Sequence, residues 1–144
     1  MSFQEKSIVA SFVTTALVWG YYFSRVYDFS TGVFAGLAGV GMLLLAAVAL
    51  TIILEIVVQA FIVARAALAN ESADAPPEDE RDKAILYRAS YFSAYILFFG
   101  VIATVIIALA TESLVIALNT LILHFVGAEL WRYLLQLYYY RRGM

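Results

Sequence analysis

The chain is short and strongly apolar: it has 144 residues, of which 64% are hydrophobic and 14% charged, and its mean hydropathy is +0.88. Soluble domains contain about 45–50% apolar and about 25% charged residues, so this composition excludes an ordinary soluble domain. The net charge of −2 offers no basic surface for nucleic acid, and the absence of cysteine excludes disulfide frameworks, thiolate zinc sites and thiol redox chemistry. At this length the sequence predicts a single integral-membrane domain over residues 1–144.

Four stretches are long and apolar enough to cross a bilayer, which takes roughly 20 residues. They cover about residues 7–24, 31–67, 90–110 and 114–138, with a polar cytoplasmic loop at about 70–82. The third and fourth stretches are separated by Thr111-Glu112-Ser113, the one polar trio in that long apolar run. The sequence therefore predicts an all-α, polytopic membrane protein, built as a four-transmembrane-helix bundle.

Basic residues near the ends of the spans predict the orientation, because cytoplasmic loops are rich in Lys and Arg. With the N-terminus inside, Arg25 is the basic residue near an outer end, and Arg132 lies within a span. The basic residues near the inner ends are Lys6, Arg65, Arg81, Lys83, Arg88, Arg141 and Arg142. We therefore expect both termini in the cytoplasm and a multi-pass protein of the cytoplasmic (inner) membrane.

The start of the second span is expected just after a turn, with Ser30 or Thr31 as the helix cap. Its early glycines include a Gly-x-x-x-Gly pattern, a spacing that lets two backbones approach closely in lipid. These helix-packing candidates are Gly32, Gly36 and Gly39. The alternative is that glycine is simply frequent in membrane helices.

The second span is interrupted by Glu55. A carboxylate inside a span costs roughly 2.5–3.5 kcal/mol on insertion scales, so it is normally turned inward and paired or used. Thr51, Glu55 and Gln59 recur every four residues and therefore line one helix face. The first span also has a polar side suited to facing other helices, which includes Ser7, Ser11 and Thr14.

The fourth span carries a second polar group, in which Glu129, Arg132 and Gln136 share a face at about 100° per residue. His124 points about 140° away from Glu129 on the same geometry, so these two residues cannot form one site within a single helix. A packing role through a hydrogen bond is favoured for His124 over a ligand role.

The depths of the two glutamates are expected to match. Glu55 lies ten residues before Arg65, and Glu129 lies twelve before Arg141, on helices that run in the same direction. We therefore predict one intramembrane polar site. It consists of Glu55, Gln59, Glu129 and Arg132, with Asn119, His124 and Gln136 as lesser candidates.

This cluster allows two interpretations. Glu129 and Arg132 at i,i+3 can neutralise each other while Glu55 completes a buried hydrogen-bonded knot, and such knots need not be functional. Alternatively, the single arginine neutralises one acid and the other acid can hold a proton or another ion. The reason is that ionising two neighbouring carboxylates in one site costs free energy.

The polar loop carries Asp79-Glu80-Arg81-Asp82, followed by Lys83-Ala84-Ile85 and Arg88-Ala89-Ser90. With the spans around it, this pattern resembles a poorly characterised family of small prokaryotic four-span membrane proteins, a domain of unknown function with an Asp-Glu-Arg-Asp motif before the third helix. The resemblance implies a prokaryotic cytoplasmic membrane and makes the motif a candidate site. The same charges also suit a solvated helix start, where acidic residues are favourable.

The sequence contains no nucleophile–base pair, phosphate loop or H-E-x-x-H pattern, so it predicts no catalytic residue, cofactor or metal site and favours a non-enzymatic role. We expect a small integral membrane protein of unknown biochemical activity, most simply a structural or accessory component of the lipid bilayer. It would associate with itself or with a larger membrane partner, and not with nucleic acid. The alternative is an oligomeric ion- or proton-coupled transporter or channel that uses Glu55 and Glu129.

Overall fold

The computed structural model describes residues 3–28, 32–68 and 80–142, apart from the side chains of Phe3, Ala66 and Ala67. The elements in chain order are α1 (Phe3–Val26), β1 (Tyr27–Asp28), β2 (Val33–Phe34), α2 (Leu37–Leu68), α3 (Glu80–Thr111) and α4 (Leu114–Arg142). Each helix is long and apolar enough to cross a membrane. The predicted all-α class with four helices of spanning length is therefore confirmed, and it indicates a multi-pass membrane protein.

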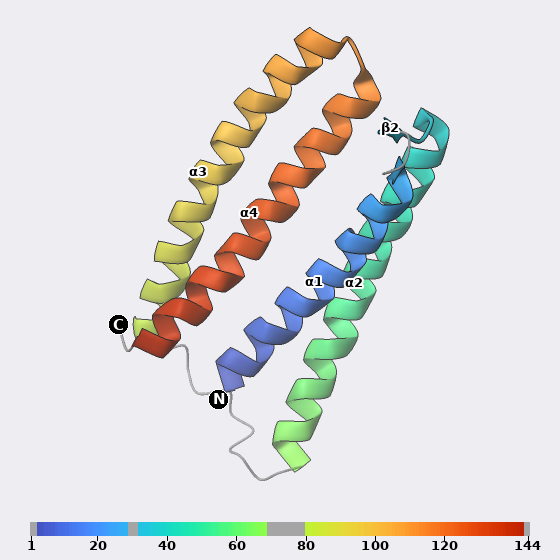
Figure 1. Cartoon of the computed structure of the whole chain (residues 1–144). Helices are drawn as coiled ribbons and strands as arrows, with labels where there is room; N and C mark the ends of the chain where they lie inside the picture. The colour runs from blue at the N-terminus through green and yellow to red at the C-terminus, as the bar shows by residue number, and fades with distance from the viewer. Residues whose placement is uncertain (1–2, 29–31, 69–79, 143–144) are drawn as a thin grey trace.

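The helices form two antiparallel hairpins that lie side by side (Figure 1). α1 packs against α2 and α3 packs against α4, and the two hairpins meet mainly where α1 contacts α4. α1 begins, α2 ends, α3 begins and α4 ends at one end of the bundle, which we call the termini end. The short strands and the α3–α4 turn lie at the opposite end, which we call the hairpin end.

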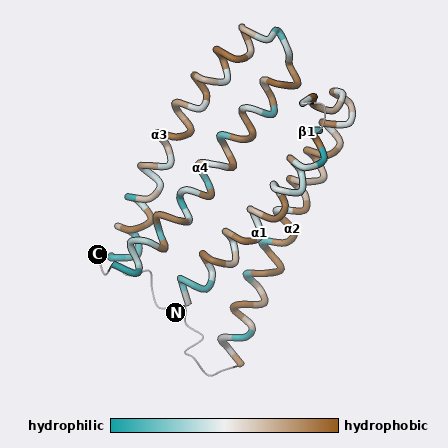
Figure 2. Tube along the Cα trace, in the orientation of Figure 1, coloured by the Kyte–Doolittle hydropathy of each residue, from teal (hydrophilic) through white to brown (hydrophobic). Residues whose placement is uncertain are grey.

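The bundle buries little of its own surface. In the most apolar stretch of α1, 28% of the residues are buried, and in that of α2 only 11% are. Large apolar side chains therefore face outward all along α2, among them Met42, Leu45 and Ile56. Figure 2 shows hydrophobic residues along much of α2 and α3, and hydrophilic ones gathered at the termini end. Outward-facing apolar surface of this extent needs lipid or further protein to cover it.

Small residues bring α3 and α4 close together. The buried face of α3 includes Ala89, Ser93, Gly100 and Thr104. The Ser93 hydroxyl donates a hydrogen bond to the Ala128 carbonyl of α4 at 2.6 Å. A methyl group added at Gly100 would overlap the side chain of His124 on α4. Close packing of backbones takes the place of a hydrophobic driving force between helices in lipid, so this contact stabilises the second hairpin.

The start of the second helix differs from the prediction. α2 begins at Leu37, so Gly32 and Gly36 lie before the helix and the Gly-x-x-x-Gly pattern is not helical. Gly32 instead has a φ of 70° in the reversal between β1 and β2, a left-handed conformation that glycine adopts without strain. Gly39 does lie on α2, with open space where a Cβ would stand.

Two-residue strands are too short to show a period of two in the sequence, which explains why β1 and β2 were not predicted. They pair Tyr27 with Phe34 in an antiparallel register, and the two rings lie 5.0 Å apart. The proposed helix caps Ser30 and Thr31 lie outside the described residues.

The remaining boundaries agree more closely with the sequence. α3 ends at Thr111 and α4 begins at Leu114, so the predicted turn is confirmed. Glu112 has a φ of 49° within it, which allows the sharp reversal. α3 begins at Glu80, inside the loop predicted at about 70–82, so the last residues of that loop form the first helical turn. α4 continues past residue 138 to Arg142.

Gly100→Ala is expected to lower the free energy of unfolding by about 1–3 kcal/mol, because the added methyl forces α3 away from His124. Gly127→Ala on α4 is the matched control, since open space surrounds that position. It should leave stability unchanged or raise it by up to about 1 kcal/mol through helix propensity. Unfolding of purified protein in mixed detergent micelles, followed by far-UV circular dichroism, measures both. Equal stability of the two variants would contradict the close α3–α4 contact.

Candidate carboxylate site

The polar face of α2 meets polar residues of α1. Glu55 and Gln59 lie one helical turn apart on α2, and Ser7 and Ser11 lie opposite them on α1. The Ser11 hydroxyl donates a hydrogen bond to Glu55 Oε1. Gln59 Nε2 donates to Glu55 Oε1 at 3.1 Å and to Ser11 Oγ at 3.0 Å, while Ser7 Oγ donates to Gln59 Oε1 at 2.7 Å. Four side chains thus form one connected network between the two helices.

Glu55 has no cationic partner within the described part of the chain. Both of its hydrogen-bond donors, Ser11 and Gln59, are neutral. Its side chain is half-buried among apolar helices. Removing an ionised carboxylate from water is costly unless a positive charge compensates it, and neutral hydrogen bonds compensate it only in part. The charge of Glu55 is therefore not compensated by a cation among the described residues.

Glu129 differs in this respect, because its partner comes from the same helix. Arg132 forms a two-pronged ion pair with it, with Nε 3.0 Å from Oε2 and Nη2 bonded to Oε1. Such paired hydrogen bonds between guanidinium and carboxylate are among the strongest side-chain contacts. The Arg132 guanidinium also lies 4.9 Å from the centre of the Tyr133 ring. Glu129 is thus already neutralised within α4.

The two glutamates face a common space. An open groove of about 340 Å³, which we call the central groove, runs between α1, α2 and α4. Glu55 lines it from α2 and Glu129 from α4, although no hydrogen bond joins these two described side chains. The remaining lining residues are Thr15, Trp19, Val48, Thr51, Ile52, Phe125, Val126 and Tyr133.

The four residues of the predicted site are therefore brought near one another but not into one cluster. Glu55 bonds with Gln59, Glu129 bonds with Arg132, and the groove separates the two groups. Sequence reasoning missed Tyr133, which lines the groove with both glutamates and whose ring centre lies 4.9 Å from the Arg132 guanidinium. The available signal was its position four residues after Glu129, on the same helix face.

Asn119, a lesser candidate, joins the two hairpins. It is 1% exposed, and its Oδ1 accepts a hydrogen bond of 3.0 Å from the Tyr22 hydroxyl of α1. Its Nδ2 donates to the Val115 carbonyl one turn earlier at 2.9 Å. Asn119 does not line the central groove. Its contacts are those of a residue that holds α4 against α1.

The other lesser candidates also lie away from the groove. His124 packs on α3 at Gly100, and its Nδ1 is 2.8 Å from the Thr120 carbonyl. Gln136 is buried, and it lies outside the groove lining. In the described ranges, no three His, Asp, Glu or Cys side chains lie together as a metal-binding group.

The charged motif lies at the termini end and ties α3 to α4. Asp82 Oδ1 accepts a hydrogen bond of 2.8 Å from the Tyr140 hydroxyl, and Arg81 Nη2 donates to the Tyr140 carbonyl at 3.5 Å. Glu80 and Asp82 stand in the first turn of α3, where negative charge stabilises a helix. Asp79 lies outside the described residues.

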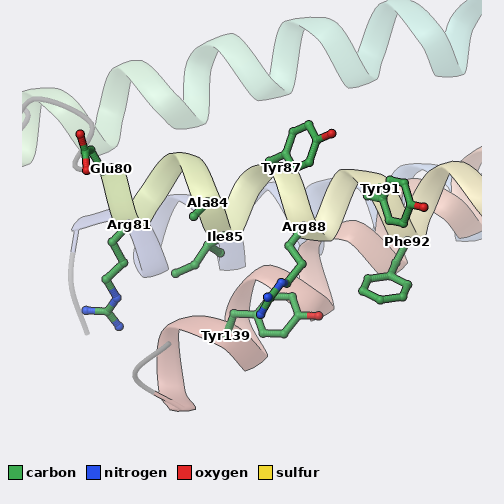
Figure 3. A pocket seen from close by; sticks show the side chains of 9 residues that line it. All are labelled: Glu80, Arg81, Ala84, Ile85, Tyr87, Arg88, Tyr91, Phe92 and Tyr139. Carbon is green, nitrogen blue, oxygen red and sulfur yellow. The ribbon is translucent and has the colours of Figure 1, made fainter.

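A larger pocket of about 940 Å³ lies beside this motif (Figure 3). Its lining residues are Glu80, Arg81, Ala84, Ile85, Tyr87, Arg88, Tyr91, Phe92 and Tyr139. Figure 3 shows Arg88 reaching from α3 to the ring of Tyr139, with its guanidinium 6.0 Å from the ring centre. Tyrosine and arginine are the residues expected where a helix end meets the lipid headgroups.

Tyr22→Phe and Asn119→Leu are expected to be coupled in a double-mutant cycle, because together they remove one buried hydrogen bond between the hairpins. Hydrogen bonds between membrane helices contribute about 0.6 kcal/mol on average and about 1.7 kcal/mol at most. Detergent unfolding of the two single variants and the double variant measures the coupling energy. Tyr21→Phe, at an exposed tyrosine of the same helix, provides the control cycle with Asn119→Leu. Equal coupling in both cycles would show that this bond does not join the hairpins.

Known proteins supply no relative from which a role for these residues can be transferred. Comparison with protein-family models, curated proteins and solved structures finds no match for this chain. The functional proposal therefore rests on the chain's own geometry.

Proposed function

We propose that the protein is a transporter or channel component for protons or small cations in a prokaryotic inner membrane, with Glu55 as the ion-binding group. The observation that carries this proposal is the contrast between the two glutamates of the central groove. Arg132 neutralises Glu129, whereas Glu55 receives hydrogen bonds from neutral side chains alone among the described residues. Ionisable residues inside a span that face a cavity commonly mark ion or proton pathways.

The depth of Glu55 supports this role. It lies ten residues before Arg65, which corresponds to about 15 Å along the helix axis. That is half the thickness of a hydrocarbon core of about 30 Å, so an ion bound there would be midway across the membrane. With both termini in the cytoplasm, as the basic residues predict, the groove would lie on the path between the two sides.

The residues around Glu55 also suit proton movement. Thr15, Thr51 and Tyr133, which carry hydroxyl groups, line the same groove, and the Thr51 hydroxyl donates a hydrogen bond of 2.8 Å to the Ala47 carbonyl. Hydroxyls can donate and accept hydrogen bonds, so together with water they can pass a proton to and from a carboxylate.

Glu55→Gln is expected to lower proton or cation flux at least about tenfold, because it removes the ionisable group and keeps the hydrogen bonds. The measurement uses protein reconstituted into liposomes with a pH-sensitive or cation-sensitive dye inside, at about pH 5 to 8. The C=O stretch of a protonated carboxyl, followed by infrared difference spectroscopy and absent in Glu55→Gln, reports proton uptake at this residue directly.

Glu112→Gln is the matched control, since Glu112 is an exposed glutamate in the α3–α4 turn, far from the groove lining. It should leave the flux unchanged. A folded wild-type protein without flux of protons or common cations would refute the transport proposal, and so would equal flux in wild type and Glu55→Gln.

A second candidate function is that of a self-associating or accessory membrane component. The observation in its favour is the exposure of α2, whose most apolar stretch is 11% buried within the chain. Gly39 of this helix is exposed and has open space beside it, so a second backbone can approach there. Protomers packed through α2 would also add walls to a pathway that one four-helix bundle provides only in part.

Substitution of Gly39 by Leu is expected to weaken association of the protein, because the bulky side chain keeps a second α2 away. Analytical ultracentrifugation in density-matched detergent measures the oligomeric state. Unchanged association, or a wild-type protein that is monomeric throughout, would contradict packing through this face. Gly20→Leu on α1, another position with open space around it, is the control for added bulk.

A further inference from the structure

We infer that the central groove binds an organic cation that carries aromatic groups, with the positive centre beside Glu55 and Glu129 and the rings against Trp19, Phe125 and Tyr133. The inference goes beyond the proposed function, because it gives the groove around Glu55 a ligand larger than a proton or a small cation.

The charges that face the groove are negative. Glu55 and Glu129 line it, and no Lys, Arg or His is among its lining residues. The nearest described cation is Arg132, which is held by Glu129 and does not line the groove. With Arg132 counted, one negative charge remains, so a monovalent cation matches the site.

The rest of the lining matches a large ligand better than a bare ion. Three of the ten lining residues are aromatic: Trp19 of α1 with Phe125 and Tyr133 of α4. Aromatic ring faces attract organic cations, and ammonium ligands are commonly bound between such rings. A volume of about 340 Å³ falls within the range of about 300–1,000 Å³ found for small-molecule pockets. A proton or a metal ion needs neither this space nor these rings.

Aromatic side chains flank the carboxylates along the groove. On α2 the lining runs from Val48 to Glu55, about 10 Å at 1.5 Å per residue, with the carboxylate at the end nearer the termini. On α1 the level of Glu55 is marked by its bond with Ser11. Trp19 lies eight residues beyond Ser11, about 12 Å toward the hairpin end. On α4, Phe125 lies four residues before Glu129 and Tyr133 four residues after it, about 6 Å to either side, so a cation surrounded by rings matches the lining.

The two tryptophans make the test direct. Trp19 lines the groove, whereas Trp131 is exposed and lies outside the lining. Trp131→Phe therefore leaves a single reporter in the site. In nanodiscs, tetraphenylphosphonium should quench Trp19 fluorescence saturably. Tetraphenylborate, an anion of nearly the same shape, should give no saturable quenching.

In the same background Glu55→Gln is expected to weaken tetraphenylphosphonium binding at least about tenfold, since it removes the compensating charge. Phe125→Leu, at a side chain that is 61% exposed and therefore tolerant of change, should weaken it about threefold by removing one ring. Glu112→Gln should bind as the parent does. Quenching that does not saturate, or that is equal in the parent and Glu55→Gln, indicates partition into lipid and overturns the inference.

The outcomes also separate this inference from the transport proposal. Saturable binding without flux would support the organic-cation site and refute transport. Flux of protons that needs Glu55, with no saturable binding of tetraphenylphosphonium, would support transport and overturn the organic-cation site.

Discussion

The polar face of α1 bonds with both helices that pack against it, α2 of its own hairpin and α4 of the other. Ser7 and Ser11 bond with Gln59 and Glu55 of the first hairpin, and Tyr22 bonds with Asn119 of the second. Apolar contacts alone do not drive helices together in lipid, because lipid tails are as apolar as the side chains they would replace. Hydrogen bonds and close contacts of small residues therefore determine the arrangement. α1 has the largest buried share of the four helices, as expected for a helix placed between two others.

The arrangement that these hydrogen bonds and close contacts produce gives the two glutamates different surroundings. Glu129 finds its cation one turn away on α4, so its neutralisation does not depend on how the helices pack. Glu55 finds neutral donors, one of them on α1, and it faces an open groove. No neighbour among the described residues compensates its charge. For this reason Glu55, rather than Glu129, is central to the proposed function.

Sparse packing distinguishes this bundle from a closed four-helix core. α2 contacts mainly α1, and its contacts with α4 are few, which leaves the central groove open between them. An open groove gives a bound molecule a direct route in from the side, whereas a closed core would admit it only after the helices separate. The exposed surface of α2 is also large enough to accept lipid or a second copy of the chain.

The sequence by itself determined the four helices, the α3–α4 turn and the polar faces of α1, α2 and α4, because these follow from apolar length and from the helical period within one segment. It also placed Glu55 and Glu129 at similar depth, since depth along a helix depends only on residue count. Tertiary structure alone decided which face of one helix contacts which face of its neighbour. The Ser11–Glu55 bond, the approach of Gly100 to His124 and the groove with Tyr133 all depend on how helices are rotated about their axes relative to their neighbours. The start of α2 was misjudged because Gly32 reads equally well as a packing residue or as the left-handed residue of a turn, and only the paired strands around it decide between them.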